Sequence, residues 1–421
     1  MNTGHVPEEH QEDYSFLQET IKDERLGPKK IAGKVGKWLG LGLVFGMAAC
    51  VSFYALKPWA TNTFQEKPDE VEIVPDDQSQ SDNPADQQEE SSVTKDSLLT
   101  IDDYYVLNNE LKQVAQEAQE SVVVVSSIED SGNWSGNKNG VVNSTSGLIV
   151  ADNGRELLIL AKYSPLKSAQ FFQVEFADET LHQASFKQKD ANLDMAVFSV
   201  AKDGISDATK EKIKIAELGN STRLGQGRTL IAVGRPFGFD DGVAYGAAST
   251  LGEAVTRADG EYEIIVTDMP YSENGSGFLF DIYGKVMGYV DSGIVGSSAG
   301  AMVAYGISDI TDGIEMMSNG KHVPYAGIVG MMVTEEASEL YEIPVGLYVT
   351  EVEMDSPAMN AGIQSGDVIT KIGKTEVTSL DAYHDALYEL EAGFSSKFSG
   401  KRYGTEEYVD MDFTVAIGIK E

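Results

Sequence analysis

Short runs of branched and aromatic residues follow one another along the middle of the chain. Examples are SVVVVSSI at 121–128, ELLILAK at 156–162 and TLIAVG at 229–234. Gly, Asn and Asp separate these runs, which is typical of β-strands joined by turns. Helical segments of about ten residues or more do not alternate with them, so the pattern predicts a barrel or sandwich rather than a doubly wound nucleotide-binding fold. No GxGxxG motif follows a strand, and we predict no cofactor.

Two stretches have the apolar spacing of amphipathic helices. One lies near 103–119, before the first strand run, and the other is SLDAYHDALYELE at 379–391. A third apolar stretch, at 38–56, carries no charge and is close to the length of about 20 residues that crosses a bilayer. A buried core helix or a cleaved signal peptide are the alternatives. A cleavable signal normally starts nearer the terminus, so we predict one transmembrane helix.

The charges around this stretch predict its orientation. Six Lys and Arg residues lie between 22 and 37, whereas only Lys57 and Lys67 follow closely. By the positive-inside rule, the N-terminus is cytoplasmic and the C-terminal domains are extracytoplasmic. The prediction is a single-pass protein of the cell membrane. Residues 57–102 are rich in acidic residues, Pro, Gln and Ser, and are predicted to form a disordered linker.

The composition excludes several functional classes. Lys and Arg number 32 against 67 Asp and Glu, a formal charge of −35, so the chain as a whole repels nucleic acid. The single cysteine, Cys50, allows neither an intramolecular disulfide nor a cysteine-based zinc site, and we predict no metal. Five histidines are available for imidazole chemistry. These are His5, His10, His182, His322 and His384.

Several segments resemble one family, the HtrA-like (Do-like) trypsin-fold serine proteases with a C-terminal PDZ domain. They are AVGRPFGFDDGVAYGAAST at 232–250, LDMAVFSV at 193–200 and NGSGF at 274–278. The resemblance implies a mainly β fold, with a trypsin-like double six-stranded β-barrel and a small α+β PDZ domain after the transmembrane helix. The expected organisation is a cytoplasmic segment at 1–37, the transmembrane helix at 38–56, the linker at 57–102, the protease domain at 103–318 and the PDZ domain at 319–421.

The resemblance also assigns candidate catalytic residues. Ser276 matches the family's nucleophile and Asp194 matches its triad aspartate, but Tyr163 falls nearest the position of the base histidine. A phenol with a reference pKa near 10 cannot replace imidazole as a general base at neutral pH. Lys162 is the alternative base, if its pKa were depressed. His182 lies in a strand-like stretch where the family has no catalytic residue.

The loop around the serine departs from the family pattern at two further positions. Asn274 stands where the family has a glycine whose N–H contributes to the oxyanion hole, and Phe278 replaces a second glycine. Ser276 and Asp194 are therefore either inert residues of an inherited scaffold or parts of an enzyme with another base. The chain is expected to be a catalytically degenerate member of the family.

The C-terminal part carries the second resemblance. SPAMNAGIQSGDVITKIG at 356–373 is similar to the turn region of PDZ domains of this family, and VPYAGIVG at 323–330 matches its carboxylate-binding loop. The resemblance implies that a peptide C-terminus adds as a strand and that the predicted helix at 379–391 forms the other wall of the groove. His384 lies on this helix as a groove or surface residue. The peptide-binding residues would be Tyr325, Ala326, Gly327 and Ile328.

Three functions remain open. The first is a pseudoprotease that binds polypeptides or their C-termini in envelope protein quality control. The second is an active serine endopeptidase that degrades misfolded envelope proteins. The third is a regulator that joins active relatives in mixed trimers. The expected partners are polypeptides and the membrane, without nucleic acid. The resemblance also implies a homo-oligomer, with a trimer as the family's common form.

Overall fold

The computed structural model describes residues 100–128, 140–167, 169–270, 272–291, 293–294 and 300–420. Within these ranges no helix is both long enough and apolar enough to cross a membrane. The predicted transmembrane helix at 38–56 and cytoplasmic segment at 1–37 lie outside the described residues, as does nearly all of the predicted linker. The described residues belong to one compact unit.

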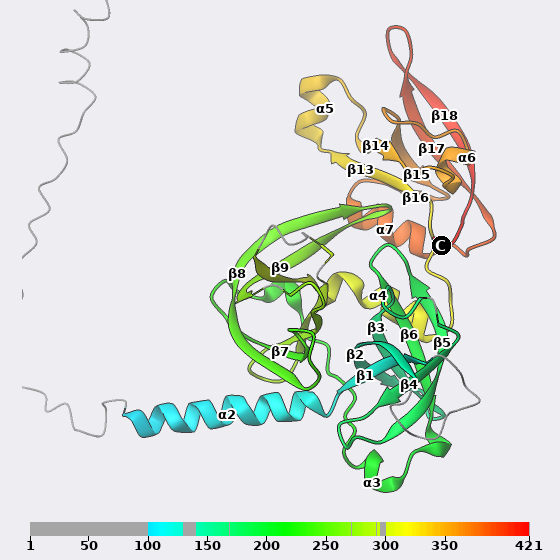
Figure 1. Ribbon diagram of the computed structural model, residues 1–421. Helices are drawn as coiled ribbons and strands as arrows, with labels where there is room; N and C mark the ends of the chain where they lie inside the picture. The colour runs from blue at the N-terminus through cyan, green and yellow to red at the C-terminus, as the bar shows by residue number, and fades with distance from the viewer. Residues whose placement is uncertain are drawn as a thin grey trace, which may run out of the picture. The chain divides into compact units, whose positions relative to one another are not determined.

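The first part of this unit is a closed six-stranded antiparallel barrel with strand order β1-β2-β3-β6-β5-β4 (Figure 1). Ile149, Ile159 and Phe198 are fully buried in its interior. Closure removes the unpaired edges that an open sheet would expose. The strands are β1 (Val122–Ile128), β2 (Val141–Asp152), β3 (Glu156–Lys162), β4 (Phe171–Glu175), β5 (Leu181–Asp190) and β6 (Met195–Ala201).

A second closed six-stranded barrel follows, with strand order β10-β11-β12-β9-β8-β7. Its longest strands, β8 and β9, form a hairpin in which Arg257 pairs with Gly260 beside the tip. The hairpin is the green pair of strands that ends near α7 in Figure 1. The strands are β7 (Thr229–Arg235), β8 (Gly242–Arg257), β9 (Gly260–Pro270), β10 (Ser276–Phe280), β11 (Val286–Asp291) and β12 (Ala301–Gly306).

A shared core joins the two barrels because alternate residues of a strand point to opposite faces. In β3, Ile159 points into the first barrel, whereas Leu158 and Leu160 belong to the core between the barrels. Phe278 of β10 and Tyr289 of β11 meet them from the second barrel. The ends of β3, β10 and β11 therefore lie around the boundary between the barrels, where the candidate site is found.

Helix α2 (Ile101–Gln119) precedes the first barrel and matches the helix predicted near 103–119. It begins with a capping box, in which Thr100 accepts a hydrogen bond from the Asp103 N–H and the Asp103 carboxylate accepts one from Thr100. Ala115 and Ala118 near its end are buried. The shorter helices of the barrels are η3 (Lys202–Gly204), α3 (Asp207–Lys210), η4 (Ser221–Arg223) and α4 (Ile307–Ser318).

The C-terminal part is a small sheet in the order β13-β14-β15-β17-β18, with β16 beside β15, flanked by helices. It has its own core, which includes Phe398, Phe413 and Leu387. Strand β13 lies at one end of the sheet, so its outer edge is not paired with another strand of that sheet. The elements are β13 (Ile328–Val333), α5 (Glu335–Tyr341), β14 (Gly346–Val352), α6 (Pro357–Asn360), β15 (Val368–Ile372), β16 (Thr375–Glu376), α7 (Leu380–Tyr388), β17 (Ser395–Tyr403) and β18 (Tyr408–Ala416).

The mainly β double-barrel prediction is thus confirmed for the described residues, together with the small α+β domain. Helix α7 matches the predicted groove helix. In the segment 356–373, which resembles the turn region of PDZ domains, α6 begins at Pro357, and Gly362 and Gly366 have positive φ, at 86° and 93°.

Candidate active site

Ser276 is the first residue of β10 and lies between two strands. It pairs with Arg235 of β7 on one side and with Asp291 of β11 on the other, and it is only 5% exposed. Gly234 permits β7 to approach Ser146 of β2 closely, because a Cβ at this position would lie 2.5 Å from the Ser146 hydroxyl oxygen. The serine is therefore held in tightly packed structure at the boundary between the barrels.

The Ser276 hydroxyl is hydrogen-bonded to the first barrel. Its oxygen accepts a hydrogen bond from the Ser146 N–H at 3.0 Å, and it donates to the Ser146 Oγ at 3.2 Å. Ser146 Oγ in turn donates to the Ser276 carbonyl at 3.1 Å and accepts from the Arg235 N–H. These bonds direct the hydroxyl proton toward another serine rather than toward a general base.

Tyr163, which falls nearest the expected histidine position, turns away from the boundary between the barrels. Its ring packs beside Phe186, with centroids 6.0 Å apart, and the Lys189 ammonium lies 5.0 Å from the ring centre. The side chain contributes to the core of the first barrel. Tyr163 therefore does not contact Ser276 or Asp194 through any hydrogen bond described for its side chain.

Lys162 occupies the position beside the aspartate instead. Its ammonium is bonded to the Asp291 carboxylate and lies 3.8 Å from Asp194 Oδ2. The Lys162 side chain is 12% exposed. In this ion pair the lysine is an ammonium, and an ammonium has no free electron pair to accept a proton from serine.

Asp194 is well anchored but in a strained conformation. It precedes β6 with φ of 53°, in the left-handed region, and its Oδ1 accepts the Ser164 N–H at 2.6 Å. Burial raises the pKa of its carboxyl, while the hydrogen bonds from Ser164 and the charge of Lys162 act in the opposite direction. The role of Asp194 as an orienting carboxylate remains a prediction, and no imidazole of the described residues lines the cleft beside it.

The described histidines lie away from this cleft. The cleft around Ser276 is lined by Lys162, Ser164, Arg235 and Asn274 among others, and no histidine of the described residues is among them. The His182 ring lies 5.3 Å from that of Phe176, and desolvation lowers its pKa. His5 and His10 are outside the described residues.

The two departures in the serine loop have different structural consequences. Asn274 is exposed in the turn before β10, while Gly275 donates its N–H to the Ser272 carbonyl. Phe278 is fully buried and packs against Tyr289 in the core between the barrels. The loop therefore contributes a large core side chain at a position where the family pattern has glycine.

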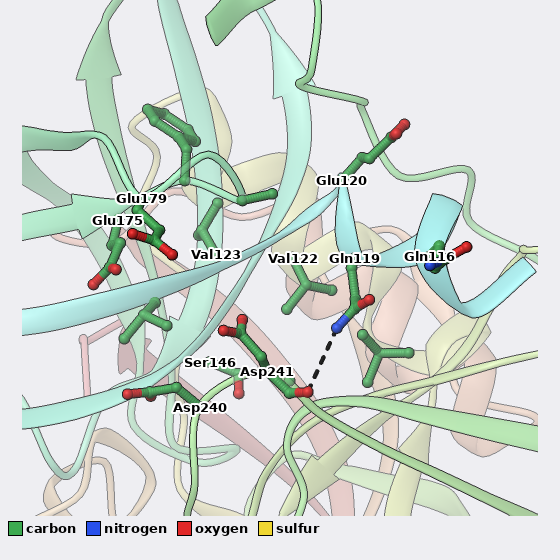
Figure 2. Close-up of a pocket in the computed structure, with 15 residues that line it drawn as sticks. Gln116, Gln119, Glu120, Val122, Val123, Ser146, Glu175, Glu179, Asp240 and Asp241 are labelled. Carbon is green, nitrogen blue, oxygen red and sulfur yellow. Dashed lines mark hydrogen bonds between the residues drawn. The ribbon is translucent and has the colours of Figure 1, made fainter. Parts of the chain in front are cut away.

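A second cleft lies between the end of α2, β1 and the turn that leads into β8 (Figure 2). Its polar residues are largely acidic, and Gln119 donates to the Asp241 carbonyl at 3.5 Å across it. A negative lining of this kind repels anionic ligands. Its labelled acidic residues are Glu120, Glu175, Glu179, Asp240 and Asp241.

The predicted carboxylate-binding loop already holds a carboxylate. The N–H groups of Ala326, Gly327 and Ile328 all donate to the side chain of Asp259, at 2.8, 2.7 and 3.0 Å. Tyr325 is different, because its N–H donates to the Gly418 carbonyl. Three of the four predicted peptide-binding residues thus converge on one carboxylate, and their role in binding peptides remains a prediction.

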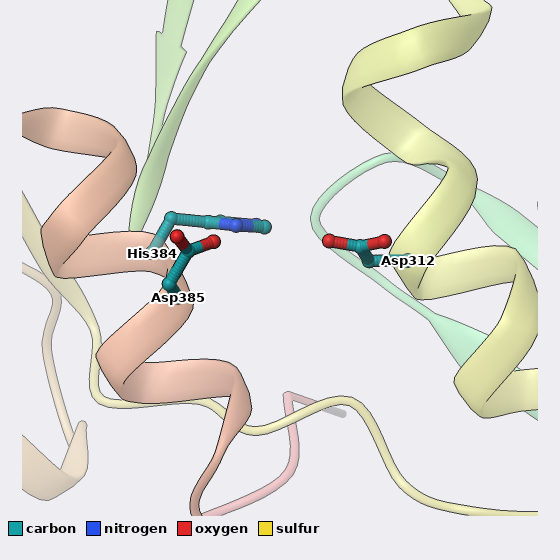
Figure 3. Close-up of side chains that lie close together, drawn as sticks. All are labelled: Asp312, His384 and Asp385. Atoms are coloured by element: carbon teal, nitrogen blue, oxygen red, sulfur yellow. The ribbon is translucent and has the colours of Figure 1, made fainter.

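One group of side chains has the composition of a metal site. Asp312 of α4 and His384 and Asp385 of α7 bring ligand atoms within 4.8 Å of one another, and Figure 3 shows His384 extending toward Asp312. The His384 ring packs on Tyr388 with centroids 3.9 Å apart, and burial lowers its pKa. Both carboxylates are exposed, so we assign no metal to this group.

Two protein-family models match the two parts of the described chain. The trypsin-like peptidase domain matches residues 145–288 and the PDZ domain matches residues 313–412. Together with the paired barrels and the curated relatives, these matches support the resemblance. The chain is HtrA-like in its domains and in its fold. This confirms the resemblance expected from the sequence, while the activity of this HtrA-like protein is a separate question.

The HtrA-like chain is similar to curated proteins and to solved structures. It is 30% identical over 275 residues to a "Probable periplasmic serine endoprotease DegP-like" of Pseudomonas fluorescens, covering 63% of this chain and 55% of the relative. It is 28% identical over 304 residues to "Serine protease Do-like HtrA" of Lactobacillus helveticus, covering 67% of this chain and 71% of the relative. The match therefore spans about half the length of the first of these relatives.

The structural likeness supports the fold. "HtrA-type protease AlgW with decapeptide" has a TM-score of 0.50 and 18% identity, covering 74% of this chain and 99% of that chain. "HtrA-type protease AlgW with tripeptide" has a TM-score of 0.50 and 20% identity, covering 74% and 97%.

Sequence reasoning named Lys162 as an alternative base but did not place it beside Asp194, and it missed Asp259 altogether. Lys162 has the same strand parity as Leu158 and Leu160, which face the second barrel, whereas Tyr163 has the parity of Ile159. Counting alternate positions along 158–163 would have placed the lysine next to Asp194. Asp259 is followed by Gly260, a pair typical of a hairpin turn, but nothing in the sequence indicates what the turn contacts.

Proposed function

We propose that this HtrA-like chain is a membrane-anchored, extracytoplasmic pseudoprotease. It binds polypeptides or their C-termini through its PDZ domain and takes part in envelope protein quality control. The observation that carries the proposal is the position of Lys162. An ammonium ion paired with Asp291 stands beside Asp194, where a triad would need a neutral imidazole.

The arrangement around Ser276 supports loss of catalysis independently of Lys162. Acyl transfer requires a nucleophile that a substrate can reach, a base for its proton and donors for the oxyanion. Ser276 is almost fully buried and bonded to Ser146, and Asn274 occupies the position of an oxyanion glycine. Replacing one side chain would therefore not restore the complete mechanism.

The peptide-binding part of the proposal rests on the PDZ domain. Its loop directs three backbone N–H groups toward one point, the arrangement that recognises a carboxylate. Strand β13 ends the sheet and offers an edge for an added strand. Related structures named as complexes with a decapeptide and a tripeptide are consistent with peptide recognition in this family.

The location is proposed from two observations of different kinds. The uncharged stretch at 38–56 predicts a single membrane anchor, with basic residues on its N-terminal side. Curated relatives are named as periplasmic endoproteases, which is consistent with extracytoplasmic domains. A homo-oligomer, such as a trimer, remains part of the proposal on the family resemblance alone.

The test is degradation of casein by the purified full-length chain, beside Ser276→Ala and Lys162→His. We expect wild type and Ser276→Ala to leave casein intact to the same extent. Lys162→His is also expected to stay inactive, because Ser276 would still be bonded to Ser146 and Asn274 would still stand where the family pattern has glycine. Cleavage by wild type that disappears in Ser276→Ala would contradict the proposal.

An active endopeptidase is the second candidate, favoured by the retained Ser276 and Asp194 and by the names of the curated relatives. In this case Lys162 would have to lose its proton and Ser276 would have to leave Ser146. Tyr163→His is a further test. Because the phenol turns into the first barrel, we expect this variant to cleave no more casein than wild type. Activity gained by the variant would show that the missing histidine alone prevents catalysis.

A further inference from the structure

The tip of the β8–β9 hairpin reaches from the second barrel into the PDZ domain. Ala258 and Asp259 form the tip, and both are buried, at 2% and 3% exposure. Asp259 has φ of 64°, so its backbone lies in the left-handed region, which Asp tolerates better than most residues. A hairpin tip is normally a solvent-exposed feature, so its burial requires a specific contact.

Four donors surround the Asp259 carboxylate. Oδ2 accepts from Ala326 and Gly327, while Oδ1 accepts from the Ile328 N–H and from the Tyr383 hydroxyl at 2.7 Å. Tyr383 belongs to α7 and is 1% exposed. An ionised carboxylate can accept all four bonds, and a buried carboxylate without them would be strongly disfavoured.

The backbone of the tip also follows the geometry of an added strand. The Asp259 N–H donates to the Ile328 carbonyl at 2.7 Å, at the first residue of the open-edged strand β13. A terminal residue bound by strand addition would combine the same two features, a carboxylate in the loop and a main-chain bond to the strand. Asp259 supplies both from within the chain.

The tip is held from a third side by the first barrel. Asn192 donates to the Ala258 carbonyl at 3.2 Å, and Lys420 donates to Asn192 and to Glu353 at 2.8 and 2.6 Å. Glu353 also accepts the Tyr325 hydroxyl. The hairpin tip therefore lies in a joint formed by both barrels and the C-terminal domain.

We propose that Asp259 is an internal ligand of the PDZ domain, which occupies the carboxylate site and must be displaced before a peptide C-terminus can bind. The inference rests on the proposed peptide-binding function and specifies how the same site is regulated. A peptide that binds only the open state loses apparent affinity in proportion to the fraction of molecules that are open. Loss of the Asp259 carboxylate should remove this competition.

The first test is amide hydrogen exchange of the full-length chain without peptide, read over the segment that contains Ala326, Gly327 and Ile328. Asp259→Asn keeps a residue that tolerates positive φ but replaces one acceptor oxygen by an NH₂ group that faces donors. We expect protected amides in wild type and a loss of protection of about tenfold or more in the variant. Equal exchange in both would overturn the internal ligand.

The second test is binding of a short fluorescein-labelled peptide that ends in valine with a free carboxylate. Asp259→Asn should bind it about tenfold or more tightly than wild type, and the C-terminal amide of the peptide should bind neither. The matched control is Asp241→Asn, which changes an exposed Asp with φ of 55° at the other end of β8. The control should bind the peptide like wild type. Equal affinity of wild type and Asp259→Asn would overturn the proposal that Asp259 competes with the peptide.

The two readouts separate the inference from the function beneath it. If exchange shows that the carboxylate site opens in Asp259→Asn but the opened variant binds no peptide, the internal ligand is supported and the proposed recognition of C-termini fails. If the peptide binds wild type and variant equally and the amides exchange equally, peptide recognition stands and the internal ligand is overturned.

Discussion

The Ser276 cleft and the carboxylate loop of the PDZ domain are built from different kinds of groups. The cleft depends on side chains, and replacements at a few positions leave Lys162 paired with Asp291 and Ser276 bonded to Ser146. The loop depends on backbone N–H groups, which every residue except proline has. Under the proposed function, replacement of single side chains removes catalysis from the cleft, whereas carboxylate recognition requires only that the loop keeps its conformation.

The largest effect on stability is expected at Phe278, and it tests whether this position serves the core between the barrels rather than catalysis. Phe278→Ala should lower the free energy of unfolding by about 3–5 kcal/mol, because it opens a cavity in the core between the barrels. Chemical denaturation of the full-length chain measures this loss. The matched control is Phe239→Ala, whose ring is 79% exposed, with an expected change within about 0.5 kcal/mol. A loss at Phe278 below about 1 kcal/mol would contradict the scaffold role.

The next effect concerns the backbone of the loop. Gly327 has φ of 87°, and a Cβ there would lie 2.3 Å from the Cβ of Ser356. Gly327→Ala should cost about 2–4 kcal/mol of unfolding free energy, from conformational strain and from the clash. Gly393→Ala has nearly the same φ, 91°, with no heavy atom within 4 Å, and should cost only about 1 kcal/mol. Similar losses in both variants would show that the loop is not tightly fitted.

A smaller effect is expected at Asp190, which supports Asn192 beside the hairpin tip. Burial raises the pKa of this carboxyl from 3.8 to about 6, and its Oδ1 accepts the Asn192 N–H. The folded state therefore holds the proton more tightly than the unfolded state. The contribution of this raised pKa to the stability of the folded state is therefore complete below about pH 4 and is lost as pH rises to about 6.

Asp190→Asn keeps the Oδ1 acceptor and removes the titration. Thermal denaturation at several pH values should show the variant gaining on wild type between about pH 4 and pH 6, by up to roughly 3 kcal/mol. Asp412→Asn is the control. A hydrogen bond from Lys397 lowers the pKa of Asp412, so the stability difference between this variant and wild type should change with pH in the opposite direction. A constant difference between Asp190→Asn and wild type would contradict the raised pKa.

Local patterns predicted the fold more completely than the site. The apolar run at 156–162 and the helical spacing at 379–391 depend on neighbours in sequence, and both elements formed as expected. The contact between Asp259 and Gly327 joins residues far apart in the chain, and no local pattern encodes it. Which of Lys162 and Tyr163 faces Asp194 was encoded by strand parity, but a match to the family position favoured the tyrosine.

The most direct test of the central claim, binding without cleavage, is reaction of the full-length chain with a fluorophosphonate probe. Such probes react with an activated serine whatever peptide the enzyme prefers, so the result does not depend on the choice of substrate. We predict that mass spectrometry finds no adduct on Ser276 of wild type, beside an active serine protease as the positive control. An adduct on Ser276 that is absent from Ser276→Ala would contradict the account.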